Sequence, residues 1–432
     1  MTSDATMKRL KHICFINPRK SEVKLADEAE VTFVPMERAT EDGVIRTTEP
    51  RSLGEVCQGF TCFRDEDVLV AKITPCFENG KGGHCLGLAN QTGFGSTEFH
   101  VLRPKPGLVP RFLFYITRTH EFRKLGEVRM YGAAGQQRVP ESFIQDWLVW
   151  LPETILQNGI ADYLDRKTAE TDALIGKKRR MIDLLHEKRR ALISEAVTKG
   201  LDPDVPTKYS GFPWLGNVPA HWTVERLRWR LRSIGQGWSP QCEGRRADPG
   251  EWGVLKVGCM NSGIFDESEN KALPPELDPV PELEIRVGDV LMSRSNTVEL
   301  VGSVGMVHQT QGRIILCDKL YRLDFDGAKL LRSYSVHLLR SRAARLQIER
   351  DATGASSSMK NISNEVVANM AFAFPQLDEQ RRIDSFIEVE LRKIAGLERR
   401  ISMQIDRLRE YRQTLISNAV TGSIGPGGGA AC

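Results

Sequence analysis

Apolar residues recur at every seventh position near the C-terminal end of the chain. The recurring positions are Ile387, Ile394, Ile401, Leu408 and Leu415, while Ile383, Leu397 and Tyr411 stand where the second apolar position of a heptad is expected. Two apolar positions in each seven residues are typical of a helix that packs along another helix. The pattern therefore predicts one long coiled-coil helix within residues 374–424.

The same pattern occurs earlier in the chain, with more polar residues in it. Its seam positions are Leu164, Thr171, Lys178, Leu185 and Leu192, accompanied by Ile160, Leu174 and Met181. Residues 151–201 align with residues 374–424 without a gap, since Leu151 corresponds to Phe374 and Leu201 to Ile424. One inserted residue would rotate everything beyond it by about 100°, so the equal lengths indicate that helix length itself matters.

The two segments also share residues outside the seam. Pro152 and Gln157 near the start of the first segment recur as Pro375 and Gln380, and both segments close on L-I-S-x-A-V-T. Antiparallel pairing of two such helices would hold two globular regions at opposite ends of a rod. The alternative, two independent helices that each pack on their own domain, remains open.

A fainter repeat in the preceding regions indicates a duplicated domain. Asp67-Val68-Leu69 recurs as Asp289-Val290-Leu291, and strands are expected at residues 68–72 and 290–293, with short helices at 111–116 and 335–339. The expected fold class is α+β, with two duplicated domains separated by two long antiparallel coiled-coil helices. The expected boundaries are 1–150 for the first domain, 151–201 for the first helix, 202–373 for a linker and the second domain, 374–424 for the second helix, and 425–432 for a disordered tail.

Length and composition agree with a protein of two globular domains. The chain has 432 residues, and no apolar run approaches the ~18 residues that cross a bilayer. Because residues 1–9 also lack the apolar segment of a secretory signal, we expect a cytoplasmic protein. The nine cysteines are scattered, with no zinc-finger spacing, which favours reduced and mostly buried thiols.

Basic residues are concentrated in two stretches, although the net charge is only +4. Residues 103–138 and 225–246 lie in corresponding halves of the chain and are rich in arginine. Such stretches can neutralise the phosphates of nucleic acid. Solvated surface charge is the alternative interpretation for either stretch alone.

The sequence offers no catalytic or metal motif. It has no Gly-x-Gly cofactor loop after a strand, no Asn/Asp-Pro-Pro-aromatic motif and no complete phosphate loop. Gly80-Lys81-Gly82-Gly83 lacks the spacing and hydroxyl of a phosphate loop and is expected to be a turn between strands. We therefore expect a non-catalytic protein without catalytic residues or metal ligands.

A breaker-rich linker at residues 202–206 leads to the segment S-G-F-P-W-L-G-N-V-P-A-H-W at residues 210–222. Together with the paired helices that open P-x-x-x-x-Q and close L-I-S-x-A-V-T, this segment resembles the specificity subunit of type I restriction-modification systems. The resemblance covers essentially the whole chain, and the paired helical segments are its most specific part.

The resemblance implies a division of labour between subunits. Each globular region would be a target recognition domain for one half of an asymmetric, bipartite sequence in double-stranded DNA. The helices would set the spacer and dock two modification subunits, which methylate adenine. Restriction subunits, which translocate and cut DNA, would join that complex. S-adenosylmethionine, ATP and Mg are then expected in the partner subunits, with no cofactor in this chain and no membrane partner.

Candidate DNA contacts are polar residues at matching places in the two domains. Gln can pair with adenine and Arg with guanine, while Ser and Lys can hold phosphates. The candidates before the last strand of each domain are Gln136, Gln137 and Arg138, and Ser357, Ser358, Lys360 and Asn361. Those after the Asp-Val-Leu strand are Lys72 and Thr74, and Arg294, Ser295 and Asn296. Arginine also occupies every second position from 226 to 232, which would place Arg226, Arg228, Arg230 and Arg232 on one face of a strand.

Two other functions compete with DNA recognition. A helical scaffold that joins partners without reading DNA, such as a decoy or inhibitor of the complex, would fit the helices, but the basic stretches disfavour a phosphate-mimicking decoy. An enzyme complete in one chain would need a cofactor or metal motif.

Overall fold

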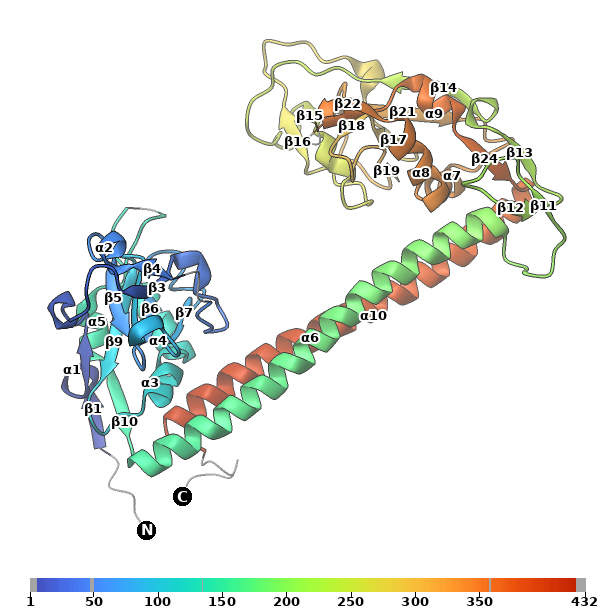
Figure 1. The fold of residues 1–432 in the computed structure, drawn as a ribbon. Coiled ribbons are helices and arrows are strands. Elements are labelled where there is room, and N and C mark those ends of the chain that lie inside the picture. Colours follow the sequence, from blue (N-terminus) through green and yellow to red (C-terminus); the bar gives the residue numbers. More distant parts are fainter. Residues whose placement is uncertain (1–5, 47–49, 134, 357–358, 425–432) are drawn as a thin grey trace. The chain divides into compact units, whose positions relative to one another are not determined.

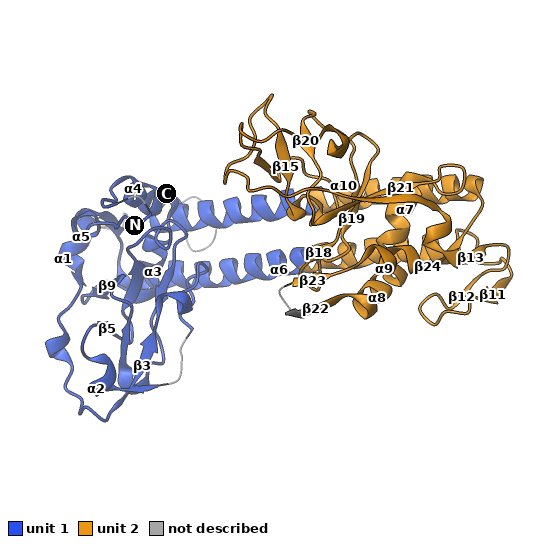
Figure 2. Ribbon diagram, turned by 90° about the horizontal axis from the view of Figure 1, so that it is seen from above, with its two compact units in different colours: residues 1–179, 401–432 blue, residues 180–400 orange. Residues whose placement is uncertain are grey.

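The protein is a mixed fold of helices and strands (Figure 1). The computed structural model describes residues 6–46, 50–133, 135–356 and 359–424, so the predicted tail at 425–432 lies outside the described residues. The chain divides into two compact units (Figure 2). Unit 1 comprises residues 1–179 with 401–432, and unit 2 comprises residues 180–400.

Two long helices run through both units, as the heptad pattern predicts. Helix α6 spans Thr154–Lys199 with 46 residues, and α10 spans Leu377–Val420 with 44 residues. At ~1.5 Å per residue each is about 66 to 69 Å long. The predicted ranges 151–201 and 374–424 begin earlier, because Leu151 and Phe374 are the last residues of strands.

The helices pair antiparallel inside each unit. In unit 1, Arg412 lies 3.2 Å from Asp172, and Lys178 donates to Gln404 at 2.7 Å. In unit 2, His186 lies 3.3 Å from Glu398. As the position along α6 rises, its partner in α10 falls, which is the pattern of two antiparallel neighbours. The prediction of paired helices is confirmed, and the alternative of two independent helices is wrong.

One of the two predicted seam positions is correct along both helices. The other is correct only at the start of each helix, where Ile160 and Ile383 are buried, and is wrong beyond it. The repeating positions 164, 171, 178, 185 and 192 in α6 and 387, 394, 401, 408 and 415 in α10 are buried or half-buried. Leu174, Met181, Leu397 and Tyr411 are instead exposed by 42 to 51%. The true companion positions come four residues after each seam residue, at 168, 175, 182, 189 and 196 and at 391, 398, 405, 412 and 419. Two of these positions in α10 hold the charged residues Glu398 and Arg412. A search for apolar residues alone therefore chose the positions on the opposite side of the seam.

Unit 1 is built around two four-stranded sheets. Its strands are β1 (Thr6–Arg9), β2 (Cys14–Ile16), β3 (Glu30–Val34), β4 (Arg51–Ser52), β5 (Thr61–Arg64), β6 (Val68–Ala71), β7 (Gly82–His84), β8 (Thr92–Gly95), β9 (Phe99–Pro104) and β10 (Leu148–Leu151). Its short helices are α1 (Leu10–Ile13), η1 (Lys20–Glu22), η2 (Met36–Arg38), α2 (Leu53–Val56), η3 (Ala89–Gln91), α3 (Pro110–Thr117), α4 (His120–Val128) and α5 (Glu141–Asp146). The sheets have strand orders β2-β9-β6-β7 and β4-β3-β8-β5, and β1 pairs separately with β10.

Unit 2 repeats the first of these sheets. Its strands are β11 (Thr207–Tyr209), β12 (Asn217–Pro219), β13 (Thr223–Arg226), β14 (Leu231–Gln236), β15 (Gly253–Leu255), β16 (Asn270–Ala272), β17 (Val290–Ser293), β18 (Ser295–Asn296), β19 (Val304–Met306), β20 (Ile314–Ile315), β21 (Leu320–Phe325), β22 (Thr353–Ser356), β23 (Met359–Asn361) and β24 (Ala371–Phe374). Its short helices are η4 (Leu227–Trp229), η5 (Val257–Met260), η6 (Pro281–Leu283), α7 (Arg332–Leu339), α8 (Arg342–Asp351) and α9 (Asn364–Asn369). The order β14-β21-β17-β19 matches β2-β9-β6-β7, and β13–β24 matches β1–β10.

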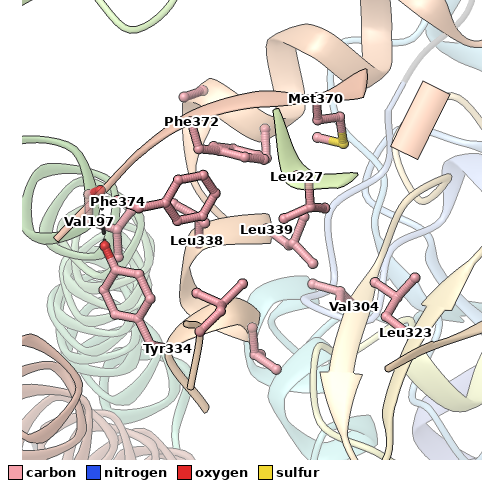
Figure 3. Close-up of a cluster of buried hydrophobic side chains, with 14 of the residues drawn as sticks. Val197, Leu227, Val304, Leu323, Tyr334, Leu338, Leu339, Met370, Phe372 and Phe374 are labelled. Carbon is pink, nitrogen blue, oxygen red and sulfur yellow. Dashed lines mark hydrogen bonds between the residues drawn. The ribbon is translucent and has the colours of Figure 1, made fainter. Parts of the chain in front are cut away.

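The core of each unit contains the end of a helix that arrives from the other half of the sequence. Ile193, Ala196 and Val197 of α6 complete the core of unit 2 together with the start of α10. Figure 3 shows Val197 beside Tyr334, whose hydroxyl lies 3.4 Å from the Val197 carbonyl. In unit 1, Ile416, Ala419 and Val420 of α10 do the same beside the start of α6. The recurring L-I-S-x-A-V-T segment therefore supplies core residues.

The predicted short elements are confirmed, but one strand is wrong. The helices expected at 111–116 and 335–339 are α3 and α7, and the strands expected at 68–72 and 290–293 are β6 and β17. The turn expected at residues 80–83 ends at Lys81, because Gly82 and Gly83 are already part of strand β7. Arg226, Arg228, Arg230 and Arg232 do not share a strand face, because the 3-10 turn η4 separates β13 from β14.

Other expectations from composition concern thiols and membranes. Cys14, Cys62, Cys85, Cys259 and Cys317 are buried, and each described cysteine is a free thiol. Among the described residues, no helix is long and apolar enough to cross a membrane.

Candidate functional site

In unit 1 the two predicted polar segments lie side by side. Ile73 and Arg138 form an antiparallel backbone bridge, and the Thr74 amide donates to the Gln137 carbonyl at 2.9 Å. The Val139 amide also donates to the Lys72 carbonyl at 2.8 Å. The chain leaving β6 is therefore held against the chain approaching α5. A helix lies between this segment and the last strand β10, which the sequence did not predict.

Arg138 is held in place by a carboxylate. Its Nε and one terminal nitrogen donate to Glu98 at 2.9 and 2.8 Å, and its other terminal nitrogen donates to the Gln136 carbonyl at 3.1 Å. The guanidinium lowers the pKa of Glu98 and stabilises its ionised form. Gln136 is exposed and Gln137 is half-buried. An arginine fixed in this way presents its remaining donor capacity in a defined direction.

Unit 2 brings its corresponding segments together in the same manner. Strand β18 pairs with β23, so that Ser295 faces Asn361 and Asn296 faces Lys360. The Ile362 amide donates to the Arg294 carbonyl at 2.9 Å, next to that pairing. The arrangement is the counterpart of the bridge between Ile73 and Arg138. The duplication thus extends from the sheet to the polar segments at its edge.

The individual candidates of unit 2 differ in accessibility. Ser295 is only 5% exposed, so its side chain would have to be uncovered before it could contact a ligand. Arg294, Asn296, Lys360 and Asn361 are half-buried. The Lys360 ammonium donates to the Gly354 carbonyl at 2.6 Å, and Asn296 donates to Asn261 at 3.0 Å. Ser357 and Ser358 lie outside the described residues.

Arg226 and Arg228 belong to a different part of unit 2. Both donate to the side-chain carbonyl of Asn369, Arg226 at 2.8 Å. Strand β13, which ends at Arg226, pairs with β24, the strand that leads into α10. These arginines therefore lie near the strand that leads into α10 and not with the segments around β18 and β23.

Part of the basic stretch at 103–138 is internal. Arg103 is 6% exposed and donates to both carboxylate oxygens of Asp67 at 2.9 and 2.8 Å. Arg118 is also 6% exposed and donates to the carbonyls of Gly80 and Glu41. Counting arginines along the sequence therefore overestimates the charge that this stretch offers to a ligand.

A buried glutamine fastens each domain to the start of its helix. In unit 1 the Gln157 amide donates to the carbonyls of Gly107 and Pro152 at 2.9 and 2.7 Å and accepts from the Val109 amide at 2.8 Å. Gln380 makes the same three bonds in unit 2, with Lys329, Pro375 and Leu331. Both glutamines are 0% exposed. The recurrence of these glutamines in the sequence marked them as notable residues, but their role became clear only from these hydrogen bonds.

Sequence reasoning missed two other groups of residues. Glu98 was not singled out, because a lone glutamate carries no signal until its partner Arg138 is known. Asp165 accepts from Tyr115 at 2.6 Å and from Arg111 at 2.8 Å, joining α3 to α6. No motif marks such a contact between distant segments.

No family model matches the chain. It is 28% identical over 458 aligned residues to the type I restriction enzyme EcoEI specificity subunit of Escherichia coli, with 88% of this chain and 76% of that one covered. It is 40% identical over 139 residues to the EcoAI specificity subunit of the same organism, covering 32% of this chain and 23% of that one.

Solved structures share the fold. One similar chain comes from a structure titled as the structural basis of complex assembly and conformational transition of the type I R-M system. The two chains superpose with a TM-score of 0.66 and are 19% identical in sequence. The match covers 98% of this chain and 99% of the other. The HsdS subunit from Thermoanaerobacter tengcongensis has a TM-score of 0.54 and 16% identity, covering 98% of both chains. These similarities support the mixed helix-and-sheet fold over the whole chain.

Proposed function

The chain is a homologue of the specificity subunits of type I restriction enzymes, and we propose on this premise that it supplies DNA sequence specificity to a type I restriction-modification complex. Its own role is non-catalytic. The observation that carries the proposal is the duplicated pair of polar segments, 72–74 with 136–138 and 294–296 with 360–361, each pair held together just after the equivalent strand β6 or β17 of its unit.

We propose further that each unit reads one half of a bipartite DNA target. Each set contains a lysine and an arginine, but the other polar side chains differ, with threonine and two glutamines in unit 1 and serine and two asparagines in unit 2. Different donors and acceptors select different bases in the major groove. The target would therefore be asymmetric, and the paired helices would set the number of base pairs between its halves.

The expected partners are double-stranded DNA, two modification subunits and the restriction subunits. The exposed faces of α6 and α10 offer docking surface for the modification subunits. S-adenosylmethionine, ATP and Mg would be bound by those partners and not by this chain.

Methylome sequencing tests the proposed function. A host that expresses this chain with its modification subunit is compared with a host that lacks only this chain. We expect an adenine-methylated bipartite motif that depends on this chain. A complex that co-purifies without any such motif would instead favour a helical scaffold or decoy.

Recognition of one half-site should depend on Arg138 and Gln137. Replacing both with alanine removes donors that can pair with bases, which we expect to cost about 1 to 3 kcal/mol of discrimination at that half-site. Binding to a panel of target duplexes, each changed in one half, measures the effect. Assembly with the modification subunit should be unchanged.

The matched control is Arg294→Ala in unit 2, which should relax the other half-site only. Loss of assembly with unchanged DNA preference in the double variant would show that the unit 1 segment is not a reader. Equal effects of both variants on both half-sites would also contradict the assignment.

A further inference from the structure

Each unit contains an arginine on one long helix that lies near a buried arginine of the domain. In unit 1 the helix residue is Arg412 of α10 and the domain residue is Arg118. Asp172 of α6 completes the arrangement, since its carboxylate lies 3.2 Å from the Arg412 Nε. Arg123 of α4 adds a third guanidinium beside Arg118 and Arg412, and the carboxylate neutralises part of the positive charge that these arginines bring together.

The repeat places the same arginines in unit 2 but removes the carboxylate. Arg189 of α6 corresponds to Arg412, and Arg340 at the end of α7 corresponds to Arg118. The residue that corresponds to Asp172 is Ala395. Among the described residues, the Arg189 side chain has neither a hydrogen bond nor an ion pair.

A cavity of about 250 Å³ occupies this place in unit 2. Arg189, Arg340, Arg392 and Ala395 line it, together with Glu388 and His337. Arg340 donates its Nε to the Val304 carbonyl at 3.0 Å and a terminal nitrogen to the Gly263 carbonyl. Both of these acceptors are neutral, so they leave the charge of Arg340 unbalanced.

Two carboxylates, those of Glu388 and Asp384, approach the His337 ring beside the cavity. Glu388 lies 3.4 Å from the His337 ring, and the same ring lies 3.4 Å from Asp384, which also accepts from Ser333 at 2.7 Å. Burial, together with the neighbouring charge of Arg189 and against the opposing effect of Glu388, lowers the pKa of Arg340 to about 10. Two like charges facing a cavity are stabilised when an anion binds between them.

We propose that this cavity of unit 2 binds a phosphate group between Arg189, Arg340 and Arg392, taking the place that the Asp172 carboxylate fills in unit 1. Planar guanidiniums match the oxygens of phosphate and can bind it with two bonds each. The favoured source of this phosphate is the DNA backbone, because the proposed function brings DNA to this chain. In this choice of source the inference rests on the proposed function.

The substitution Ala395→Asp tests the proposal in the full-length chain, because it restores the carboxylate of unit 1 at an exposed helical position. Ala395→Asn is the matched control, with nearly the same volume and no charge. Arg189→Gln removes a phosphate donor without touching Arg340, whose bonds hold the fold. Two probes are used. With inorganic phosphate, the unfolding midpoint of each variant is compared with its value in chloride at the same ionic strength. With duplex DNA, the affinity of each variant is measured as a function of salt concentration.

We expect inorganic phosphate to stabilise the wild type and the Asn variant but not the Asp or Gln variant. The slope of log affinity against log salt should fall by about 0.9 in the Asp and Gln variants, the value for one lost phosphate contact. Sequence preference should be unchanged. A response to inorganic phosphate with an unchanged DNA slope would assign the site to a free phosphate compound instead.

The proposal is overturned if neither probe distinguishes the Asp variant from the Asn variant. It is also overturned if the Asp variant loses only its association with a partner protein, since a partner carboxylate would then be the natural ligand. A wild type that binds DNA without sequence preference would refute the proposed function, while the inorganic phosphate result would still decide the cavity.

Discussion

Removing seven residues from both long helices, Leu174–Arg180 and Leu397–Met403, should abolish modification of the original target and create a preference for a shorter spacer. Seven residues keep the seam in register, because a heptad differs from two full turns by only about 20°. Each helix becomes about 10 Å shorter, which corresponds to roughly three base pairs at ~3.4 Å each. The bases read at each half-site should not change. Methylome sequencing of a host that expresses the variant measures both quantities.

The matched control is a duplication of the same two segments, which should lengthen the spacer by a similar amount. A deletion in α6 alone is a second control, since it unpairs the seam and should prevent correct folding. An unchanged spacer in a correctly folded double deletion would show that the helices do not set the distance.

Replacing Gln157 or Gln380 with alanine should lower the free energy of unfolding by about 2 to 4 kcal/mol. Each substitution leaves two carbonyls and one amide without their partner, and the carbonyl of Pro152 or Pro375 belongs to a buried residue. An unsatisfied buried group costs about 1 to 3 kcal/mol before relaxation. Denaturant unfolding of the full-length chain measures the effect. Since the two glutamines share no partner, the double variant should lose about the sum of the single effects.

Gln404→Ala provides the comparison on a helix surface. Gln404 makes one exposed bond, to Lys178 at 2.7 Å, so its loss should change stability by less than about 0.5 kcal/mol. If Gln157→Ala lowered the free energy of unfolding equally little, water or a rearranged loop would have to satisfy the two carbonyls and the amide that Gln157 binds. The glutamine would then not be the fastening of the domain to its helix.

The two buried arginines show why charge along the sequence is an incomplete guide to function. Arg103 and Arg118 fall in a basic stretch, yet both lie in the interior with oxygen acceptors around them. The local sequence does not distinguish a buried arginine from an exposed one. The difference depends on Asp67 and on the carbonyls of Gly80 and Glu41, which the fold brings to the guanidiniums.

The sequence alone determined the duplication, the two long helices and one of the two seam positions of each heptad. Heptad spacing is a local property, because residues that recur every seven positions lie on one face of a helix whatever else surrounds them. The gapless alignment of 151–201 with 374–424 likewise needs no coordinates. The sequence also marked the polar segments as equivalent, since 72–74 and 294–296 follow the repeated Asp-Val-Leu strand and 136–138 and 360–361 come before the last strand of each domain.

Only the tertiary structure decided which side of the seam is buried and which helix end completes which core. Residues three and four positions after a seam residue lie on either side of it, so the partner helix decides between Leu397 and Glu398. The placement of Val197 against Tyr334, of Glu98 against Arg138 and of Arg189 against an uncharged Ala395 joins residues that are far apart in the sequence. Such pairs depend on how the chain folds back on itself, and no local pattern contains that information.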